Sequence, residues 1–168
     1  MRIAVLLALS AYVVSGAGSE PQLAADPFGQ MKSLAGEWQA DLPGYGQIFD
    51  SIRVVSKGTA LEETLGTPAD NEVSFYTRDG GRVLLTHFCA LTADGHVARL
   101  KSGALQGSPG ELDFTLASLS NLVDEAAPHM RRVVITFIDR DHFRERWTKT
   151  EKGVDAVFDL QFARRPAS

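Results

Sequence analysis

The chain has 168 residues, enough for one domain with a substantial core, and its 17 Lys and Arg against 21 Asp and Glu give a formal charge of −4. The basic residues are scattered, which argues against a nucleic-acid partner, because contacts to phosphates need a concentrated basic surface. The single cysteine, Cys89, excludes an intramolecular disulfide, so stability must come from burial and from hydrogen bonds between strands.

Residues 1–17 have the three regions of a secretory signal peptide. Arg2 supplies the positive charge, Ile3–Val14 forms an apolar core too short to span a bilayer, and Ser15-Gly16-Ala17 offers small residues to a peptidase. We therefore expect cleavage after Ala17 and a periplasmic or secreted protein. No cysteine follows the apolar run directly, so a lipoprotein anchor is not expected.

The remainder predicts a flexible segment over 18–25 and one domain over 26–166. No later segment approaches the roughly 20 apolar residues of a spanning helix, so we expect no transmembrane anchor. The domain opens with a helix signal: Asp26 is suited to the N-cap, Pro27 to the first helical position, and Phe28 and Met31 recur at helical spacing. Gly36 is expected to end this two-turn helix.

From Gly36 onward the apolar period changes to two, which is typical of strands. The first run, 36–42, places Gly36 and Trp38 on one face and Glu37 on the other, so Trp38 is expected to point inward. Nine further runs follow at about 47–55, 60–65, 72–77, 82–91, 96–102, 111–116, 132–138, 143–150 and 154–164.

Turn residues such as Asp79-Gly80-Gly81, Asp94-Gly95 and Lys152-Gly153 separate these runs and predict successive hairpins. About ten antiparallel strands would leave two exposed sheet edges, and closure into an up-and-down barrel removes both. The sequence thus predicts an all-β barrel with a short N-terminal helix; a two-sheet sandwich is the alternative.

The last run indicates how the barrel closes. Its alternation places Arg164, and not Arg165, on the inward face. A guanidinium at that position can stack on the indole of Trp38, an interaction worth about 1 to 2 kcal/mol when partly desolvated. We therefore expect Gly36, Trp38 and Arg164 to join the first strand to the last.

Candidate functional residues cluster on two runs and one loop. His87 and Cys89 leave the same face of their strand, and His129 and Met130 are expected to approach from a long loop over 117–130 that also holds Asn121. Loops of this length often form lids or binding loops. These side chains suit copper or haem iron, or zinc if a carboxylate joins them, although no close metal-ligand spacing is present.

Glu145 shares a face with Trp147, and a carboxylate beside an aromatic ring inside a barrel needs a partner or a proton. Pairing with Arg99 or Lys101 is the structural interpretation of Glu145. For Cys89 and His87 the structural interpretation is a small buried side chain and a satisfied core histidine. A Cys-His nucleophile pair is disfavoured, because adjacent positions on one strand face give poor attack geometry.

Several motifs together resemble a bacterial lipocalin-like family of the calycin superfamily. They are Ser33-Leu34-Ala35-Gly36-Glu37-Trp38, Leu85-Thr86-His87-Phe88-Cys89-Ala90, Pro128-His129-Met130, Asp141-His142-Phe143 and Glu145-Arg146-Trp147-Thr148. Phe88 departs from the tyrosine common in that family, and residues 91–95 lack its usual Asn-Gln-Pro. The resemblance implies a calycin barrel over nearly the whole domain and implies no particular activity.

Two functions remain open at this stage. The first is an exported barrel that binds a small apolar or amphipathic molecule at His87, Cys89, Asn121, His129, Met130, Glu145 and Trp147, with no cofactor and no catalytic residue. The second is a haem- or metal-binding barrel, or a barrel enzyme, that uses His87, Cys89 and His129. A third interpretation is a barrel that is filled by its own side chains, binds no small molecule and serves as an assembly module.

Overall fold

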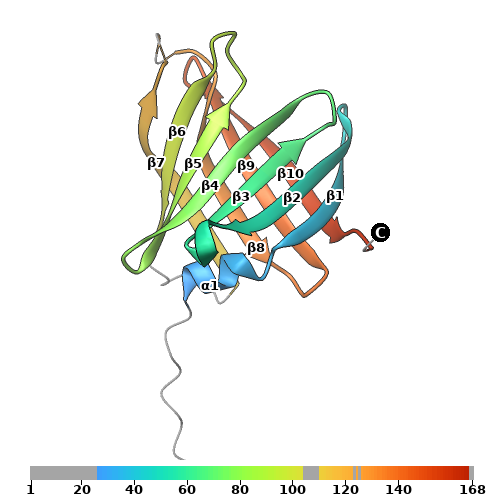
Figure 1. Cartoon of the computed structure of the whole chain (residues 1–168). Helices are drawn as coiled ribbons and strands as arrows, with labels where there is room; N and C mark the ends of the chain where they lie inside the picture. The colour runs from blue at the N-terminus through green and yellow to red at the C-terminus, as the bar shows by residue number, and fades with distance from the viewer. Residues whose placement is uncertain (1–25, 104–109, 123, 125, 167–168) are drawn as a thin grey trace, which may run out of the picture.

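The computed structural model describes residues 26–103, 110–122, 124 and 126–166. The predicted signal peptide over 1–17 and the segment 18–25 lie outside these residues. The described chain forms one short helix and a closed barrel of ten antiparallel strands in the order β1-β10-β9-β8-β7-β6-β5-β4-β3-β2 (Figure 1). The predicted barrel is therefore confirmed, and the sandwich alternative is wrong.

The strands follow the predicted runs closely, and each pairs with its neighbour in the chain. Their bounds are β1 Gly36–Leu42, β2 Gly46–Val55, β3 Ala60–Gly66, β4 Asn71–Asp79, β5 Arg82–Cys89, β6 His96–Ser102, β7 Glu111–Ser120, β8 His129–Phe137, β9 His142–Glu151 and β10 Val154–Arg164. A short 3-10 turn, η1 Ser56–Gly58, joins β2 to β3. No helix in the described part of the chain is long and apolar enough to cross a membrane.

Helix α1 (Pro27–Lys32) covers one end of the barrel and packs against β4 and β5 (Figure 1). Phe28 and Met31 are buried, as their spacing predicts. The predicted cap is only partly right: Asp26 occupies the N-cap position but makes no side-chain capping bond, and its carboxylate pairs with Arg78 of β4 instead. The ion pair attaches the start of the helix to the barrel wall.

Two bulges change which side chains face the interior. In β7 the pairing with β6 shifts between Arg99 and Leu100, and in β8 the pairing with β9 skips Arg131. An extra residue reverses the alternation, so Met130 shares the inner face with Val133. The predicted loop over 117–130 is also too long, because β7 continues to Ser120 and β8 begins at His129.

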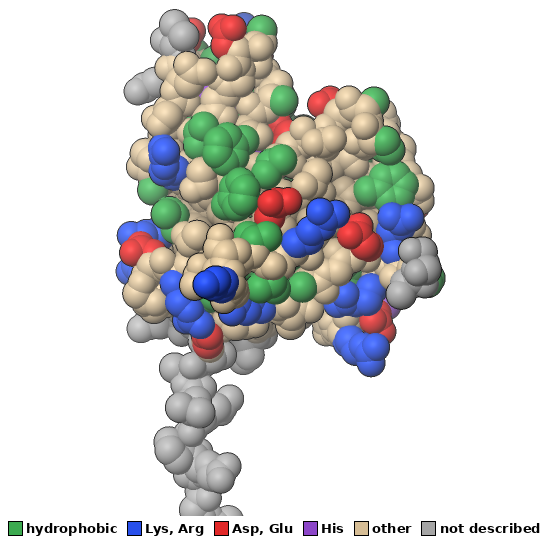
Figure 2. Space-filling model, viewed as in Figure 1, with side chains coloured by type: hydrophobic (Ala, Val, Ile, Leu, Met, Phe, Trp, Pro, Cys, Tyr) green, Lys and Arg blue, Asp and Glu red, His purple; other side chains and the backbone are tan. Residues whose placement is uncertain are grey.

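The outer face of β4 to β6 carries its own apolar side chains, and Figure 2 shows them gathered on the viewed side of the barrel. Phe88 is exposed there, and its ring lies edge to face against Phe75 at 6.2 Å between centroids. Strand alternation then turns His87 and Cys89 to the opposite face, where both are buried. The inward orientation of these two residues follows.

Candidate functional site

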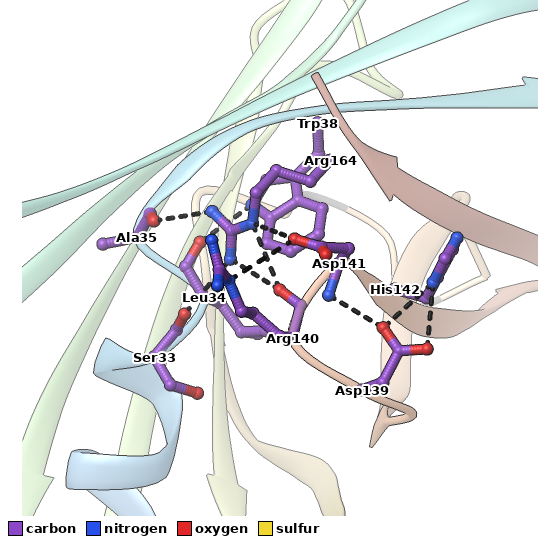
Figure 3. Close-up of polar contacts among 9 residues, drawn as sticks. All are labelled: Ser33, Leu34, Ala35, Trp38, Asp139, Arg140, Asp141, His142 and Arg164. Carbon is purple, nitrogen blue, oxygen red and sulfur yellow. Dashed lines mark hydrogen bonds and ion pairs between the residues drawn. The ribbon is translucent and has the colours of Figure 1, made fainter. Parts of the chain in front are cut away.

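Arg164 closes the barrel as the sequence predicts (Figure 3). Trp38 of β1 is the register partner of Arg164 in β10, and the guanidinium lies 3.9 Å from the centre of the indole ring. Arg164 also donates from Nη1 to the Ala35 carbonyl at 3.1 Å and from Nη2 to the Arg140 carbonyl at 3.0 Å. Arg165 points outward, against Phe49.

Gly36 is required beside this contact. A side-chain carbon at position 36 would collide with Nη1 of Arg164, and the φ of +146° is a conformation that other residues rarely adopt. Trp38 in turn donates from its indole nitrogen to the Leu34 carbonyl at 2.8 Å. Gly36, Trp38 and Arg164 therefore act as structural closure residues, at the α1 end of the barrel.

A belt of buried polar side chains crosses the middle of the barrel. Five strands contribute to it, and its members are Asp50 of β2, Glu63 of β3, Ser74 and Tyr76 of β4, His87 of β5 and Glu145 of β9. No Lys or Arg is fully buried within the described residues, so the carboxyl groups of the belt share no interior cation. The belt therefore depends on hydrogen bonds and on bound protons.

Two carboxyl groups of the belt have identifiable donors. Tyr76 donates to both oxygens of Glu63 at 3.0 Å, and Trp147 donates from Nε1 to Oε2 of Glu145 at 2.8 Å. Burial raises the pKa of Glu63 in spite of these donors, and burial together with the charge of Glu63 raises the pKa of Glu145 well above its usual range. The folded state therefore favours the protonated forms of both groups, which titrate as a coupled pair.

Asp50 is the least satisfied member of the belt. Neither of its carboxyl oxygens has a hydrogen-bond partner among the described residues, and it is 1 % exposed. Burial, followed by the negative charges of Glu63 and Glu145, raises the pKa of Asp50 well above its ordinary value. The folded state accordingly favours the protonated, neutral form of Asp50.

The predicted partners of Glu145 are wrong. Arg99 and Lys101 lie on the outer face of β6, where Arg99 donates to Ser120 and Lys101 pairs with Asp79. Strand β6 is also three places away from β9 in the barrel, so neither cation reaches Glu145. Trp147, two residues along the same strand face, provides the hydrogen bond instead.

His87 connects the belt to the open end of the barrel, opposite α1. Its Nδ1 lies 3.1 Å from the hydroxyl of Ser74, and its ring lies 4.8 Å from that of Trp147. Nε2 lies 3.2 Å from Oε2 of Glu72, yet the two atoms are not aligned for a hydrogen bond. Nε2 is thus a buried polar atom that faces a carboxylate without a hydrogen bond to it.

Glu72 stands at the start of β4 and is held in place by the chain. The amide of Ala90 donates to its Oε1 at 2.7 Å, which leaves Oε2 directed at His87. Burial opposes ionisation here, but the contacts with His87, Ala90 and Cys89 outweigh it and lower the pKa of Glu72. Glu72 is therefore a carboxylate at neutral pH.

Next to His87 and Glu72, toward the open end of the barrel, lies an apolar cavity of about 140 Å³, which we call the cup. Glu72, His87 and Trp147 form its polar side, and Met130 reaches it because of the β8 bulge. The remaining walls are the apolar residues Leu42, Ile48, Leu65, Leu91, Phe158 and Leu160. A small molecule in the cup would meet apolar walls and a polar base.

The other predicted site residues lie elsewhere. Asn121 donates from Nδ2 to the Gly95 carbonyl at 2.8 Å and lines an open depression beside the connection from β5 to β6. His129 lies close to the Ala127 carbonyl, with Nδ1 at 2.9 Å, and lines a second depression with Arg131. The structure therefore brings together His87, Met130, Glu145 and Trp147 around the belt and cup. Cys89 lies next to His87 and Glu72 but lines the same depression as Asn121, and His129 lies apart from both.

Cys89 is buried and lies close to Glu72, and it lines the depression beside the connection from β5 to β6. Burial and the negative charge of Glu72 raise the pKa of its thiol to about 12. Since the thiolate is the nucleophile, Cys89 is unreactive in this state. The raised pKa of this thiol therefore gives no support to a Cys-His nucleophile.

No protein-family model and no curated protein matches this chain.

Proposed function

We propose that this protein binds a small amphipathic molecule in the cup, with the apolar part between Leu65 and Leu160 and the polar group on His87 and Glu72. The observation that carries this proposal is the combination of apolar walls with a polar base that includes the unsatisfied Nε2 of His87. A ligand able to hydrogen-bond this atom would remove the cost of leaving it buried and unpaired.

The size of the cup limits the ligand. Its volume of about 140 Å³ is close to the roughly 150 Å³ of an engineered apolar cavity that holds benzene. Towards α1, the barrel is filled by side chains that include Phe114, Phe143 and Phe162. One ring or a short branched chain therefore fits, whereas a long acyl chain has no room.

Charge limits the polar group of the ligand. Glu72 is ionised, and no Lys or Arg among the described residues is fully buried near the belt. A carboxylate on the ligand would meet negative charge without compensation, so a hydroxyl or amine is favoured. The ligand class is therefore a small aromatic or branched alcohol, phenol or amine.

The location and class of the protein belong to the same proposal. The signal-like pattern over 1–17 supports export to the periplasm or the medium. The motifs around Trp38, His87 and Trp147 support a lipocalin-like barrel. Sequencing of the exported protein is expected to give Gly18 as the first residue, and an intact N-terminus in the cytoplasm would contradict export.

Calorimetric titration with three matched probes tests the binding. We expect 4-methylphenol to bind, 1,4-dimethylbenzene to bind at least about tenfold more weakly for lack of the hydroxyl, and dodecanoate not to bind. Leu65→Trp fills the cup and should abolish binding of 4-methylphenol, whereas Val54→Trp, on the outer surface, should not. The proposal is refuted if Leu65→Trp and Val54→Trp bind 4-methylphenol with equal affinity, or if wild type does not bind it.

A further inference from the structure

Three side chains with metal-binding atoms meet beside the cup, and two of them, Glu72 and His87, line it. The ligand atoms of Glu72, His87 and Cys89 all lie within 4.8 Å of one another, and His87 and Cys89 are buried. Strand pairing produces this cluster: the register Val73↔Phe88 sets Glu72 of β4 opposite Cys89, with His87 two residues away on the same face. Adjacent strands hold all three residues, so their spacing is fixed by the ladder.

A hydrogen bond orients the imidazole for coordination. The hydroxyl of Ser74 lies 3.1 Å from Nδ1 of His87. When Nδ1 donates its proton to this hydroxyl, the neutral imidazole carries its lone pair on Nε2. Metal-binding histidines in proteins are held in this way, with the second nitrogen donating to an oxygen.

The Nε2 lone pair then faces another acceptor. Oε2 of Glu72 lies 3.2 Å away, and the two atoms are not aligned to share a proton. Around tetrahedral zinc, bonds of about 2.0 to 2.3 Å set neighbouring ligand atoms about 3.3 to 3.5 Å apart. The observed separation therefore suits two ligands of one zinc ion.

We propose that Glu72, His87 and Cys89 bind a zinc ion whose fourth position opens toward the cup. Nitrogen, sulfur and oxygen donors together are typical of zinc, and an open fourth position is typical of sites that also take a small ligand. Binding replaces the thiol proton of Cys89 with the metal, and the proton leaves to solvent. Zinc also supplies the positive charge that the described interior lacks.

The cup makes haem a poor alternative to a single ion. A cavity of about 140 Å³ takes one ring, and a porphyrin contains four pyrrole rings around its metal. His129, which the sequence groups with His87 and Cys89, does not belong to the cluster of the described residues. Glu72 is instead the third member of the cluster with His87 and Cys89.

Metal titration of the full chain, stripped with a chelator, tests this site. We expect one Zn²⁺ per chain by calorimetry, and we expect Co²⁺ to give a thiolate-to-cobalt charge-transfer absorption. Cys89→Ser should remove that absorption, and His87→Ala and Glu72→Gln should each weaken Zn²⁺ binding at least about tenfold. Circular dichroism on each variant checks that the barrel is retained.

Two further variants separate this site from other causes. Ser74→Ala should weaken Zn²⁺ binding about 10- to 100-fold, because it frees the ring of His87. His142→Ala should have no effect; it removes the exposed histidine that contacts Asp139 and so controls for surface binding. The proposal is overturned if wild type binds no stoichiometric zinc, if Cys89→Ser keeps the cobalt absorption, or if only His142→Ala reduces binding.

The zinc site does not rest on the binding of an organic ligand. Zn²⁺ is titrated with no organic molecule present, and 4-methylphenol is titrated into the chelator-treated protein. Failure of either titration therefore leaves the other result intact.

Discussion

Arg164 makes closure contacts that its neighbour Arg165 does not make. Arg164→Ala removes the stacking on Trp38 and charge-assisted hydrogen bonds to backbone carbonyls around α1 and the β8–β9 turn. We expect a loss of about 2 to 4 kcal/mol in the free energy of unfolding, measured by urea denaturation. Arg165→Ala should cost less than about 0.5 kcal/mol, and similar losses in the two variants would contradict the assignment.

Gly36 offers a second residue-scale test, because two effects of a side chain there are separable. Gly36→Ala adds both backbone strain and a collision with Arg164, whereas Gly44→Ala adds strain at a φ of +85° with no atom within 4 Å. We expect Gly44→Ala to cost about 1 kcal/mol and Gly36→Ala at least about 1 kcal/mol more by the same measurement. Equal costs would show that the collision is relieved at no expense.

The bulge in β8 decides at the element scale which side chains reach the cup. Deletion of Arg131 removes the extra residue and leaves Met130 beside Arg132 and opposite Lys149, so Met130 should stay inward, and Arg131→Ala keeps the bulge. Met130 is 7 % exposed, so its oxidation by peroxide should be slow in wild type, in Arg131→Ala and in the deletion variant alike. Mass spectrometry of the Met130 peptide measures the rates; a rate several-fold faster in the deletion variant would contradict the assignment of Arg131 as the extra residue.

The two bulges limit what the alternating sequence pattern can predict about this fold. Alternation and turn residues predict the number and order of strands, because hairpins are local and the period-two pattern survives from β2 to β6. Bulges are invisible to that pattern, so the lengths of β7 and β8 and the inward turn of Met130 were not predictable.

The candidate site follows a similar division. His87, Cys89, Glu145 and Trp147 are predictable, since unusual side chains share one face with apolar neighbours. Glu72, Ser74 and Asp50 are not, because their role depends on cross-strand register and on the far wall of the closed barrel. The polar residue Ser74, set among the inward positions of β4 between Glu72 and Tyr76, is the signal that could have indicated the belt.

The whole molecule combines two opposing groups of carboxyls. At the surface, Arg144 lowers the pKa of Asp159, and Arg78 lowers that of Asp26, so the folded state favours their ionised forms. Inside, burial raises the pKa of Asp50 and Glu145, so the folded state favours their protonated forms. Stability is therefore expected to be greatest at mildly acidic pH, between the two ranges.

Asp50 allows the interior contribution to be measured alone. Its folded pKa lies well above the ordinary value of 3.8, so between these two values the folded chain binds more protons than the unfolded chain, and the free energy of unfolding falls as pH rises. We expect wild type, with chelator present, to lose stability from pH 5 to pH 8, and Asp50→Asn to lose at least about 1.4 kcal/mol less, the equivalent of one pKa unit.

Asp41→Asn is the matched control. Asp41 lies on β1, the strand that pairs with Asp50 through Trp38, but its side chain is exposed. Its urea midpoints should follow those of wild type across the pH range. An Asp50→Asn profile parallel to that of wild type would mean that the folded chain holds Asp50 ionised. Water or a cation would then have to enter the belt, since neither carboxyl oxygen has a hydrogen-bond partner among the described residues.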